Sequence, residues 1–216
     1  MTAPAAATPD KDGRIPPRTR ILVAAADLFY RHGIRAVGVE AIAEAADTNK
    51  MTLYRHFASK DELVAEYLRE SANAADRCWD RFAQGHPGDP LAQLCAWLED
   101  MARHLAEPNQ RGCALANAAI ELPEKDHPAR RVVEEYKKAQ RTRLARLAEE
   151  AGLSDPEMLA DELHLLLEGA RVSAQSVGTE GLAARLLHMG KAMIASHRGR
   201  RRQNLADPQL RSGRKG

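Results

Sequence analysis

The stretch TNKMTLYRHFASKDEL, residues 48–63, constrains the fold more than any other part of the chain. Its apolar residues Leu53 and Phe57 lie four positions apart, as on one face of a short helix. The helical pattern breaks at Ala58, and Ser59 is then followed three residues later by Glu62. Ser and Glu at that spacing form a capping box, which marks the start of a helix. The stretch therefore predicts two successive helices with an abrupt junction between them.

Between Thr48 and Lys60 the stretch carries no negative charge. The cations Lys50, Arg55 and Lys60 occur there together with His56. Small hydroxyl and amide side chains and one tyrosine accompany them, namely Thr48, Asn49, Thr52 and Tyr54. Such a surface suits phosphate oxygens and base edges, because it offers donors and positive charge with little bulk. We interpret the first helix of the stretch as a DNA-recognition helix.

The residues before this stretch predict two supporting helices. Apolar residues recur at helical spacing over residues 18–32, and Gly33 then provides a left-handed stop. A second, short helix is expected at residues 39–46, with Gly38 as its N-cap. Residues 47–49 form a tight turn before the third helix, at residues 50–57. A support helix followed by two short helices joined by a turn is the helix-turn-helix arrangement.

Composition narrows the class of protein further. The chain is rich in Ala, Leu, Glu and Arg and poor in aromatic residues, which favours an all-α fold. Its formal net charge is only +2, so any affinity for nucleic acid must come from local clustering of cations. Three widely spaced cysteines indicate free thiols of a reducing compartment. With no apolar run near the ~18 residues of a membrane span and no signal peptide, we expect a cytoplasmic protein without a membrane partner.

The rest of the sequence predicts six more helices, about nine in all. The helix that starts after Ser59 is expected to continue to Gly85, and further helices are expected at residues 91–106, 113–122, 129–151, 156–177 and 182–197. Asp155 is the expected N-cap of the helix at residues 156–177. We expect a disordered arm at residues 1–15, a helix-turn-helix domain at 16–70, a second helical domain at 71–198 and a disordered basic tail at 199–216.

Residues 25–68, AADLFYRHGIRAVGVEAIAEAADTNKMTLYRHFASKDELVAEYL, resemble the TetR-type transcriptional repressors. The most specific part is the LYRHFASKDEL run, at its distance from the IAEAAD helix. The resemblance implies a homodimer whose recognition helices enter successive major grooves of double-stranded operator DNA. It also implies a C-terminal helical domain that binds a small-molecule effector. We expect the last two helices to form the dimer interface as a four-helix bundle.

The candidate DNA-binding residues lie in the basic arm, the two short helices and the helix that follows them. They are Arg18, Arg20, Val39, Thr48, Asn49, Lys50, Met51, Thr52, Tyr54, Arg55, His56 and Lys60. Of these, Lys50, Thr52 and Arg55 are the candidates for reading bases. Three positions depart from the commonest family pattern: Gly38 replaces a Ser or Thr cap, Asp47 a turn Gly, and Met51 a Gly of the recognition helix. Asp47 must therefore tolerate a left-handed conformation, and Met51 would make an apolar base contact.

The candidate effector pocket combines apolar side chains with a few polar groups, as ligand pockets usually do. Its candidates are Trp79, Trp97, Cys113, Asn117, His164, Arg171 and Gln175. Asn117 lies in a nearly all-apolar helix that should be buried, so it needs a partner from the protein or from a ligand. His164 and Glu168 have the spacing of metal ligands but lack a third ligand. No phosphate-binding loop, zinc motif or nucleophile elbow occurs, so we expect neither an enzyme nor a cofactor.

Two alternatives remain compatible with the sequence. A regulator of the same class could respond to oxidation of a thiol, through Cys78 or Cys113. A protein from another class could use the same fold as a ligand carrier or an enzyme that does not bind DNA. Specific binding to DNA distinguishes the second alternative, and the response of a variant without cysteines distinguishes the first.

Overall fold

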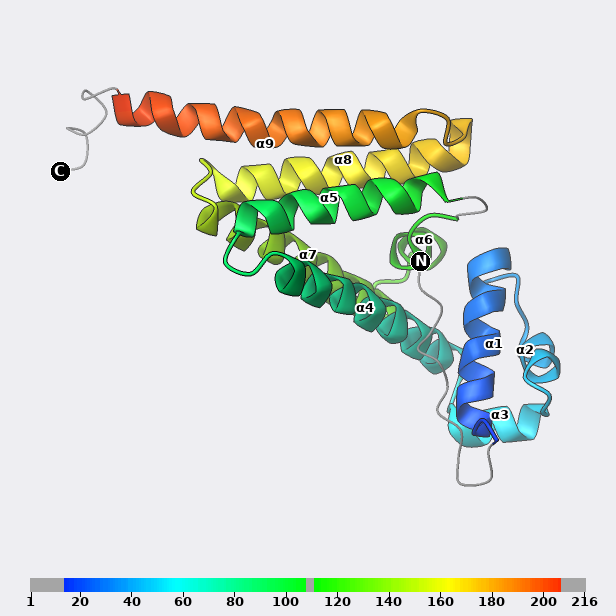
Figure 1. Ribbon diagram of the computed structural model, residues 1–216. Coiled ribbons are helices and arrows are strands. Elements are labelled where there is room, and N and C mark those ends of the chain that lie inside the picture. The colour runs from blue at the N-terminus through cyan, green and yellow to red at the C-terminus, as the bar shows by residue number, and fades with distance from the viewer. Residues whose placement is uncertain (1–13, 108–110, 207–216) are drawn as a thin grey trace. The chain divides into compact units, whose positions relative to one another are not determined.

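The computed structural model describes residues 14–107 and 111–206, with backbone only from residue 199 onward. Within these ranges it contains nine helices and no strand, as the sequence predicted (Figure 1). The helices are α1 (Pro17–His32), α2 (Val39–Ala45), α3 (Lys50–His56), α4 (Lys60–Gly85), α5 (Pro90–Ala106), α6 (Ala114–Glu121), α7 (Pro128–Glu150), α8 (Pro156–Val177) and α9 (Leu182–Ala206). None of the helices in these ranges is both long and apolar enough to cross a bilayer.

The chain forms two compact units, each built from two segments. The first unit joins residues 1–79 with 109–137, and the second joins residues 80–108 with 138–216. Helices α4 and α7 each contribute to both units. Helix α6 therefore packs in the unit that holds the helix-turn-helix, although the sequence suggested a domain boundary at residue 70. That residue 70 separates the DNA-binding function from the effector-binding function remains a prediction.

One hydrophobic core holds the first unit together. Ile21, Ile42, Leu53, Leu63 and Leu68 are fully buried side chains of α1 to α4 in this core. Helix α6 adds Ala114, Leu115 and Ala118, and the start of α7 adds Val132 and Val133. Burial of a large aliphatic side chain contributes roughly 1.5–3 kcal/mol. Leu53 alone therefore gives α3, which has only seven residues, a substantial attachment to α1 and α2.

The turn between α2 and α3 uses a left-handed residue, as expected. Asp47 has φ of 49°, and the N–H of the next residue, Thr48, donates to the carbonyl of Ala43 at 2.9 Å. Gly38 occupies the N-cap position of α2, also as expected, but it has no side chain that could cap the helix. Helices α1, α2 and α3 pack on one another in the blue-to-cyan part of Figure 1.

Side-chain caps produce the abrupt junction between α3 and α4. Asn49 caps α3 by accepting the N–H of Thr52 at 2.9 Å. Ser59 accepts the N–H of Glu62 at 3.0 Å, which confirms the first half of the capping box. In return, the carboxylate of Glu62 accepts the N–H of Ala58 at 2.7 Å, one residue earlier than the Ser59 N–H of a regular box. Both hydrogen bonds stabilise the start of α4.

Helices α5, α8 and α9 pack pairwise in the second unit and run side by side in Figure 1. The core there contains Leu94, Trp97 and Leu98 from α5 and Leu159 and Leu163 from α8. Leu144, Leu147 and Ala148 of α7 complete it.

One local expectation for the second unit was wrong, and another held only in part. Asp155 occupies the N-cap position of α8 and Pro156 begins the helix, as expected, but the Asp155 side chain makes no capping hydrogen bond, because its φ of 49° and ψ of 58° are left-handed. An N-cap normally has an extended backbone that aims its side chain at the first helical N–H groups. Helix α9 also continues to Ala206, past the expected end at His197. The sequence RRRQNLA consists mainly of good helix formers and lacks proline. Residues 1–13 of the expected arm and 207–216 of the expected tail lie outside the described residues.

Candidate nucleic-acid interface

Helix α3 has a buried side and an exposed side. Leu53 and the residue after the helix, Phe57, are buried in the core of the first unit, as expected. Met51 is 76% exposed and Tyr54 is 43% exposed. Arg55 is also exposed, while Thr52 and His56 are half-buried. Packing of Leu53 and Phe57 thus turns a mixed surface of one thioether, one phenol and one guanidinium outward, where it can meet a partner.

The turn before α3 carries two of the candidate contacts. Thr48 is half-buried, and Asn49 is exposed. Because the Asn49 side chain already caps α3, one of its oxygen lone pairs is committed to the protein. Its amide NH₂ group remains a donor.

Lys50 forms an ion pair that the sequence did not reveal. Its ammonium donates to the carboxylate of Glu40, the second residue of α2, at 2.6 Å. This hydrogen bond is the main cause that lowers the pKa of Glu40 and raises the pKa of Lys50. Both groups are therefore charged at neutral pH. Glu40 was missed because it lies ten residues before Lys50 in the sequence, and only the fold of α2 against α3 brings the carboxylate close.

Arg18 and Arg20, two expected DNA contacts, have partners within the first unit. Arg18 donates to Glu66 at 2.9 Å and lies over the ring of Phe57, with 5.0 Å from its guanidinium carbon to the ring centroid. Arg20 donates to both the carbonyl and the carboxylate of Asp47, at 3.1 and 3.3 Å. Both arginines thus brace the helix-turn-helix from α1. Their contact with DNA remains a prediction.

Val39 and Lys60 also differ from simple surface contacts. The Val39 side chain is buried in the core of the first unit, so this candidate cannot offer its side chain to DNA without rearrangement. The ammonium of Lys60 lies 5.9 Å from the centroid of the Phe29 ring. Burial lowers the pKa of Lys60, although the neighbouring Asp61 and Glu121 act in the opposite direction. Lys60 is half-buried and keeps part of its surface for a phosphate.

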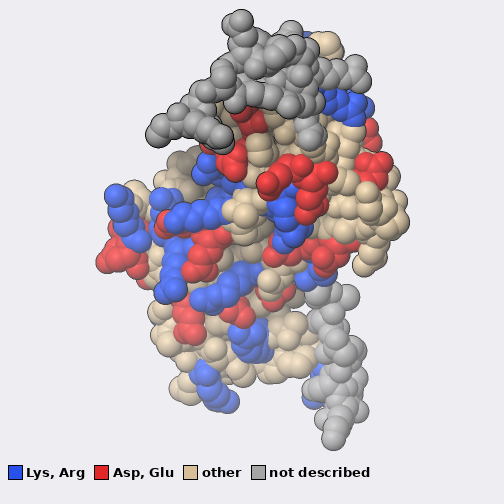
Figure 2. Space-filling view, turned by 90° about the vertical axis from the view of Figure 1, so that its left-hand side faces the viewer, with Lys and Arg blue, Asp and Glu red and all other residues tan. Residues whose placement is uncertain are grey.

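Positive and negative side chains are mixed on the one face of the molecule that Figure 2 draws. On the face drawn in Figure 2, Lys and Arg side chains are interspersed with Asp and Glu, without a large area of a single sign. The face drawn in Figure 2 therefore lacks the single-sign field that attracts nucleic acid from a distance. Exposed ion pairs also occur within single helices, such as Asp27 with Arg31 in α1 and Arg131 with Glu135 in α7.

Comparisons with known proteins identify the family of the helix-turn-helix and of the helices that follow it. Residues 21–67 match the model of bacterial regulatory proteins of the tetR family, and residues 90–189 match the tetracyclin repressor-like C-terminal domain. A putative TetR-type transcriptional regulator from Streptomyces avermitilis is 32% identical, with a TM-score of 0.72 over 84% of this chain and 98% of that one. The chain belongs to the TetR family. This is a family of DNA-binding transcriptional regulators.

Two further proteins are similar to this TetR-family chain. A TetR-family regulator from Streptomyces coelicolor has a TM-score of 0.79 and is 27% identical, over 84% of this chain and 95% of that one. The transcriptional repressor KstR2 of Rhodococcus jostii is 47% identical over 66 residues. That match spans 31% of this chain and 31% of the relative, so it covers less than a third of the curated protein.

The expected effector residues of the TetR-family chain do not all lie in one unit. Trp79, Cys113 and Asn117 belong to the first unit, and Trp97, His164, Arg171 and Gln175 belong to the second. Trp79 and Trp97 are buried, and Gln175 is exposed. Arg171 of α8 donates to Glu168 at 2.7 Å and to the sulfur of Met101 in α5 at 3.7 Å. The role of these residues in binding an effector remains a prediction.

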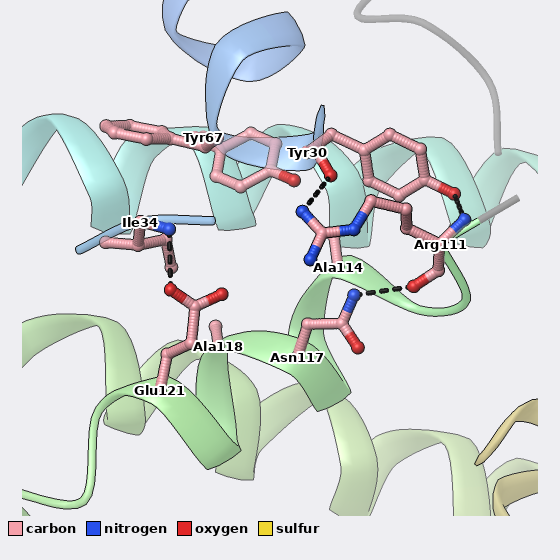
Figure 3. Close-up of a pocket in the computed structure, with 9 residues that line it drawn as sticks. Tyr30, Ile34, Tyr67, Arg111, Ala114, Asn117, Ala118 and Glu121 are labelled. Atoms are coloured by element: carbon pink, nitrogen blue, oxygen red, sulfur yellow. Dashed lines mark hydrogen bonds between the residues drawn. The ribbon is translucent and has the colours of Figure 1, made fainter. Parts of the chain in front are cut away.

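Asn117 is the one expected effector residue that lines a small pocket within the first unit (Figure 3). Helix α6 is only partly buried, contrary to expectation, since Ile120 is 76% exposed and Asn117 is half-buried. The Asn117 amide donates to the carbonyl of Arg111 at 2.6 Å, so its partner comes from the protein. Arg111 in turn donates to the carbonyl of Tyr30 at 3.1 Å, and its backbone N–H donates to the Tyr30 hydroxyl at 2.9 Å. The space inside is about 10 Å³, roughly the size needed for one water molecule.

Glu121 closes the other end of this pocket and joins α6 to the helix-turn-helix. Its carboxylate accepts the backbone N–H of Ile34 at 2.6 Å and that of Arg35 at 3.2 Å. These two residues follow Gly33, where φ of 88° turns the chain out of α1 toward α2. Sequence reasoning missed this contact, because Glu121 is 87 residues from Ile34 and no local pattern relates them.

Burial works against thiol reactivity at two of the three cysteines of the TetR-family chain, Cys78 and Cys95. Cys78 is buried and donates to the carbonyl of Ala74 at 3.5 Å. Burial raises the pKa of Cys95, which leaves less of the nucleophilic thiolate at neutral pH. Cys113 is half-buried at the N-cap position of α6. In the described residues, no three His, Cys, Asp or Glu side chains are arranged to hold a metal ion.

Proposed function

We propose that the protein is a homodimeric repressor that binds double-stranded operator DNA through α3 and leaves it when a small molecule binds. The observation that carries this proposal is the orientation of α3. Its apolar side is fixed in the core by Leu53 and Phe57, and Met51, Tyr54 and Arg55 face outward together. In a helix-turn-helix protein the second short helix enters the major groove and its first residues meet base edges.

The contacts divide into two kinds. Lys50, Thr52 and Arg55 are proposed to read bases, and Met51 to make an apolar contact with a thymine methyl group. Tyr54, His56 and Lys60 are proposed to contact phosphates, which position the protein without carrying sequence information. We assign Arg18 and Arg20 mainly to holding the helix-turn-helix in shape, because Glu66, Phe57 and Asp47 already engage them.

Dimerisation through α8 and α9 is supported by apolar side chains that the single chain leaves exposed. On α8, Met158, Leu165 and Val172 are 55%, 70% and 56% exposed and lie seven residues apart, as on one side of a helix that packs in a bundle. Gly169 lies between the last two, with nothing within 4 Å of the position of a Cβ atom, so another helix could approach closely there. Helix α9 adds Met189, a large apolar residue that is also exposed.

Contacts of α6 support a way in which effector binding could change the affinity for DNA. Asn117 and Glu121 both belong to α6, and Glu121 holds the loop that leads from α1 into α2. A ligand that prefers a shifted position of α6 would disturb that loop and with it the spacing of two recognition helices on one DNA duplex. The affinity for DNA can fall only as far as the ligand prefers the shifted state.

The proposal is tested by titrating salt against binding to DNA from upstream of the protein's own gene. The logarithm of the specific binding constant should fall linearly with the logarithm of the salt concentration, because the phosphates release counterions when the protein binds. An unrelated duplex of equal length serves as control and should bind much more weakly at every salt concentration. Equal binding of both duplexes would refute the proposal. Because its target is chromosomal DNA, we expect the protein in the cytoplasm, and we propose no catalytic activity.

A further inference from the structure

The ion pair of Glu40 with Lys50 joins α2 to α3 on the exposed surface of the helix-turn-helix. Its two side chains are 69% and 54% exposed, and the Nζ to Oε1 distance is 2.6 Å. Exposed ion pairs contribute little to folding stability, so stability is a weak reason for placing one here. The pair instead joins the first turn of α2 to the first residue of α3 on the open surface of the domain.

We propose that Glu40 and Lys50 act as one unit that reads a single G·C base pair in each half of the operator. This inference rests on the proposed function, since it requires that the start of α3 meets the major groove. Glu40 would be a specificity-determining residue in its own right, not only a counter-ion for Lys50.

The chemistry of the major groove favours this assignment. A guanine presents two adjacent acceptors there, N7 and O6, and the N4 amino group of its paired cytosine lies beside them as a donor. Lysine donates to the guanine acceptors, and a carboxylate accepts from cytosine N4. A cation and an anion held side by side therefore match the order acceptor, acceptor, donor along a G·C pair. An A·T pair alternates acceptor, donor, acceptor, which offers Lys50 no two adjacent acceptors.

Both side chains keep hydrogen-bonding capacity after they pair. An ammonium has three N–H donors, and one of them serves Glu40. A carboxylate can accept about four hydrogen bonds, so Glu40 can hold Lys50 and still accept from a base. The pair also preorganises the long Lys50 side chain, which otherwise loses conformational freedom on binding.

A carboxylate on a DNA-facing surface has a further consequence. It repels phosphates and base acceptors, so it weakens binding wherever no amino group is present to meet it. Glu40 would thus lower the affinity for wrong sequences more than it raises affinity for the right one, which is an effective way to gain specificity.

The test selects bound sequences from random duplex DNA with the full-length wild-type protein, Glu40→Gln and Lys50→Ala. The wild-type protein should enrich G·C at one position of each half-site. Both variants should lose preference at that same position, by on the order of ten-fold, and keep preferences elsewhere. Glu40→Gln should in addition bind unrelated DNA more tightly, because a negative charge is removed.

Asp27→Asn is the matched control. Asp27 forms an exposed pair with Arg31 in α1 at 2.8 Å, so this variant also removes one negative charge and one exposed ion pair from the same unit. It should leave the preference at every position unchanged.

Other outcomes overturn the inference. If Glu40→Gln binds all DNA more tightly with the preferences intact, or if the two variants relax different positions, Glu40 and Lys50 do not read one base pair. Failure of the wild-type protein to enrich any sequence would overturn the proposed function itself, and the wild-type selection distinguishes the two failures. The thermal unfolding midpoint of each variant is measured as a control. A midpoint equal to that of the wild-type protein excludes loss of the fold as the cause of a changed sequence preference.

Discussion

Glu121 of α6 accepts the backbone N–H of Ile34 at 2.6 Å, and so ties α6 to the loop that enters the helix-turn-helix. The carboxylate replaces a hydrogen bond that this loop cannot obtain from helix or sheet. A hydrogen bond to a charged group contributes roughly 1.5–3 kcal/mol when it is well shielded from water.

Glu121→Ala should therefore lower the free energy of unfolding by roughly 1–3 kcal/mol, because two backbone N–H groups lose their acceptor. Glu121→Gln keeps one oxygen acceptor and should lose less. Urea unfolding measures both values. Glu124→Ala, which removes an exposed pair with Arg35, is the control and should change stability by less than about 1 kcal/mol. A similar loss for Glu121→Ala and Glu124→Ala would show that the Glu121 contact is not a fixed part of the fold.

Gly190 allows α9 to approach α5 closely. A Cβ atom at this position would lie 2.6 Å from Cδ2 and 2.7 Å from Cδ1 of Leu98, a fully buried side chain with little room to move. Gly190→Ala should therefore destabilise the protein by about 1–3 kcal/mol despite the better helix propensity of Ala. The double variant Gly190→Ala with Leu98→Val should recover part of the loss measured by thermal unfolding. Independent, additive losses in the double variant would contradict the contact.

Leu165 gives a test of the dimer. Leu165→Glu places a charge in the middle of the exposed apolar line on α8 and should shift the protein toward monomers in analytical ultracentrifugation. Ile120 of α6 is as exposed, at 76%, and lies outside the proposed interface. Ile120→Glu should leave the dimer intact. If both variants dissociate to the same extent, or neither does, α8 is not the interface.

His104 is expected to make stability depend on pH. A hydrogen bond that the His104 ring donates to Asp100 is the main cause that raises the pKa of His104, and Asp100 is itself a buried carboxylate. A raised pKa means that the folded state binds the proton more tightly than the unfolded state. This contribution is complete below the unfolded pKa of about 6.5 and is lost as pH rises through the higher folded value.

Urea unfolding between pH 5.5 and 8.5 measures this dependence. The wild-type protein should lose stability with rising pH relative to His104→Gln, which cannot be protonated. Parallel curves for the two proteins would mean that His104 gains no net interaction from Asp100 on protonation.

Lys60 and Arg55 should affect DNA binding in different ways. Lys60→Ala should weaken binding to all sequences and reduce the slope of log affinity against log salt by about one unit, since one phosphate contact is lost. Arg55→Ala should instead relax the preference at one base position and cost roughly 1–3 kcal/mol at the preferred sequence. Fluorescence anisotropy with specific and unrelated duplexes measures both effects. Identical behaviour of the two variants would remove the proposed division between phosphate and base contacts.

Local features of the fold could be predicted from the sequence, because they depend on residues close together in the chain. The capping box at Ser59 and Glu62 and the left-handed Asp47 are of this kind, and the structure places both as expected apart from the acceptor bond to Ala58. The same reasoning placed Asp155 correctly at the N-cap position of α8 but not its side chain, since a favourable residue type does not determine the backbone angles that a side-chain cap requires.

The contacts of the candidate site were less accessible to sequence reasoning. Arg18 and Arg20 looked like free cations of a basic arm, yet Glu66 and Asp47 hold them at separations of 48 and 27 residues. Glu40 was not considered at all as a contact of Lys50. Each of these pairs forms only after buried side chains have packed the helices together.

The sequence by itself determined that this protein is helical, that it carries a helix-turn-helix, and that the stretch richest in hydrogen-bond donors begins at Thr48. Periodicity, caps and turns are local, so a single sequence contains the information that specifies them. Only the tertiary structure decided three contacts: the ion pair of Lys50 with Glu40, the hydrogen bond of Glu121 to the loop after α1, and the close approach of Gly190 to Leu98, which leaves no room for a side chain. These contacts join residues 10 to 92 positions apart, and packing of the whole core, not any local pattern, sets their distances.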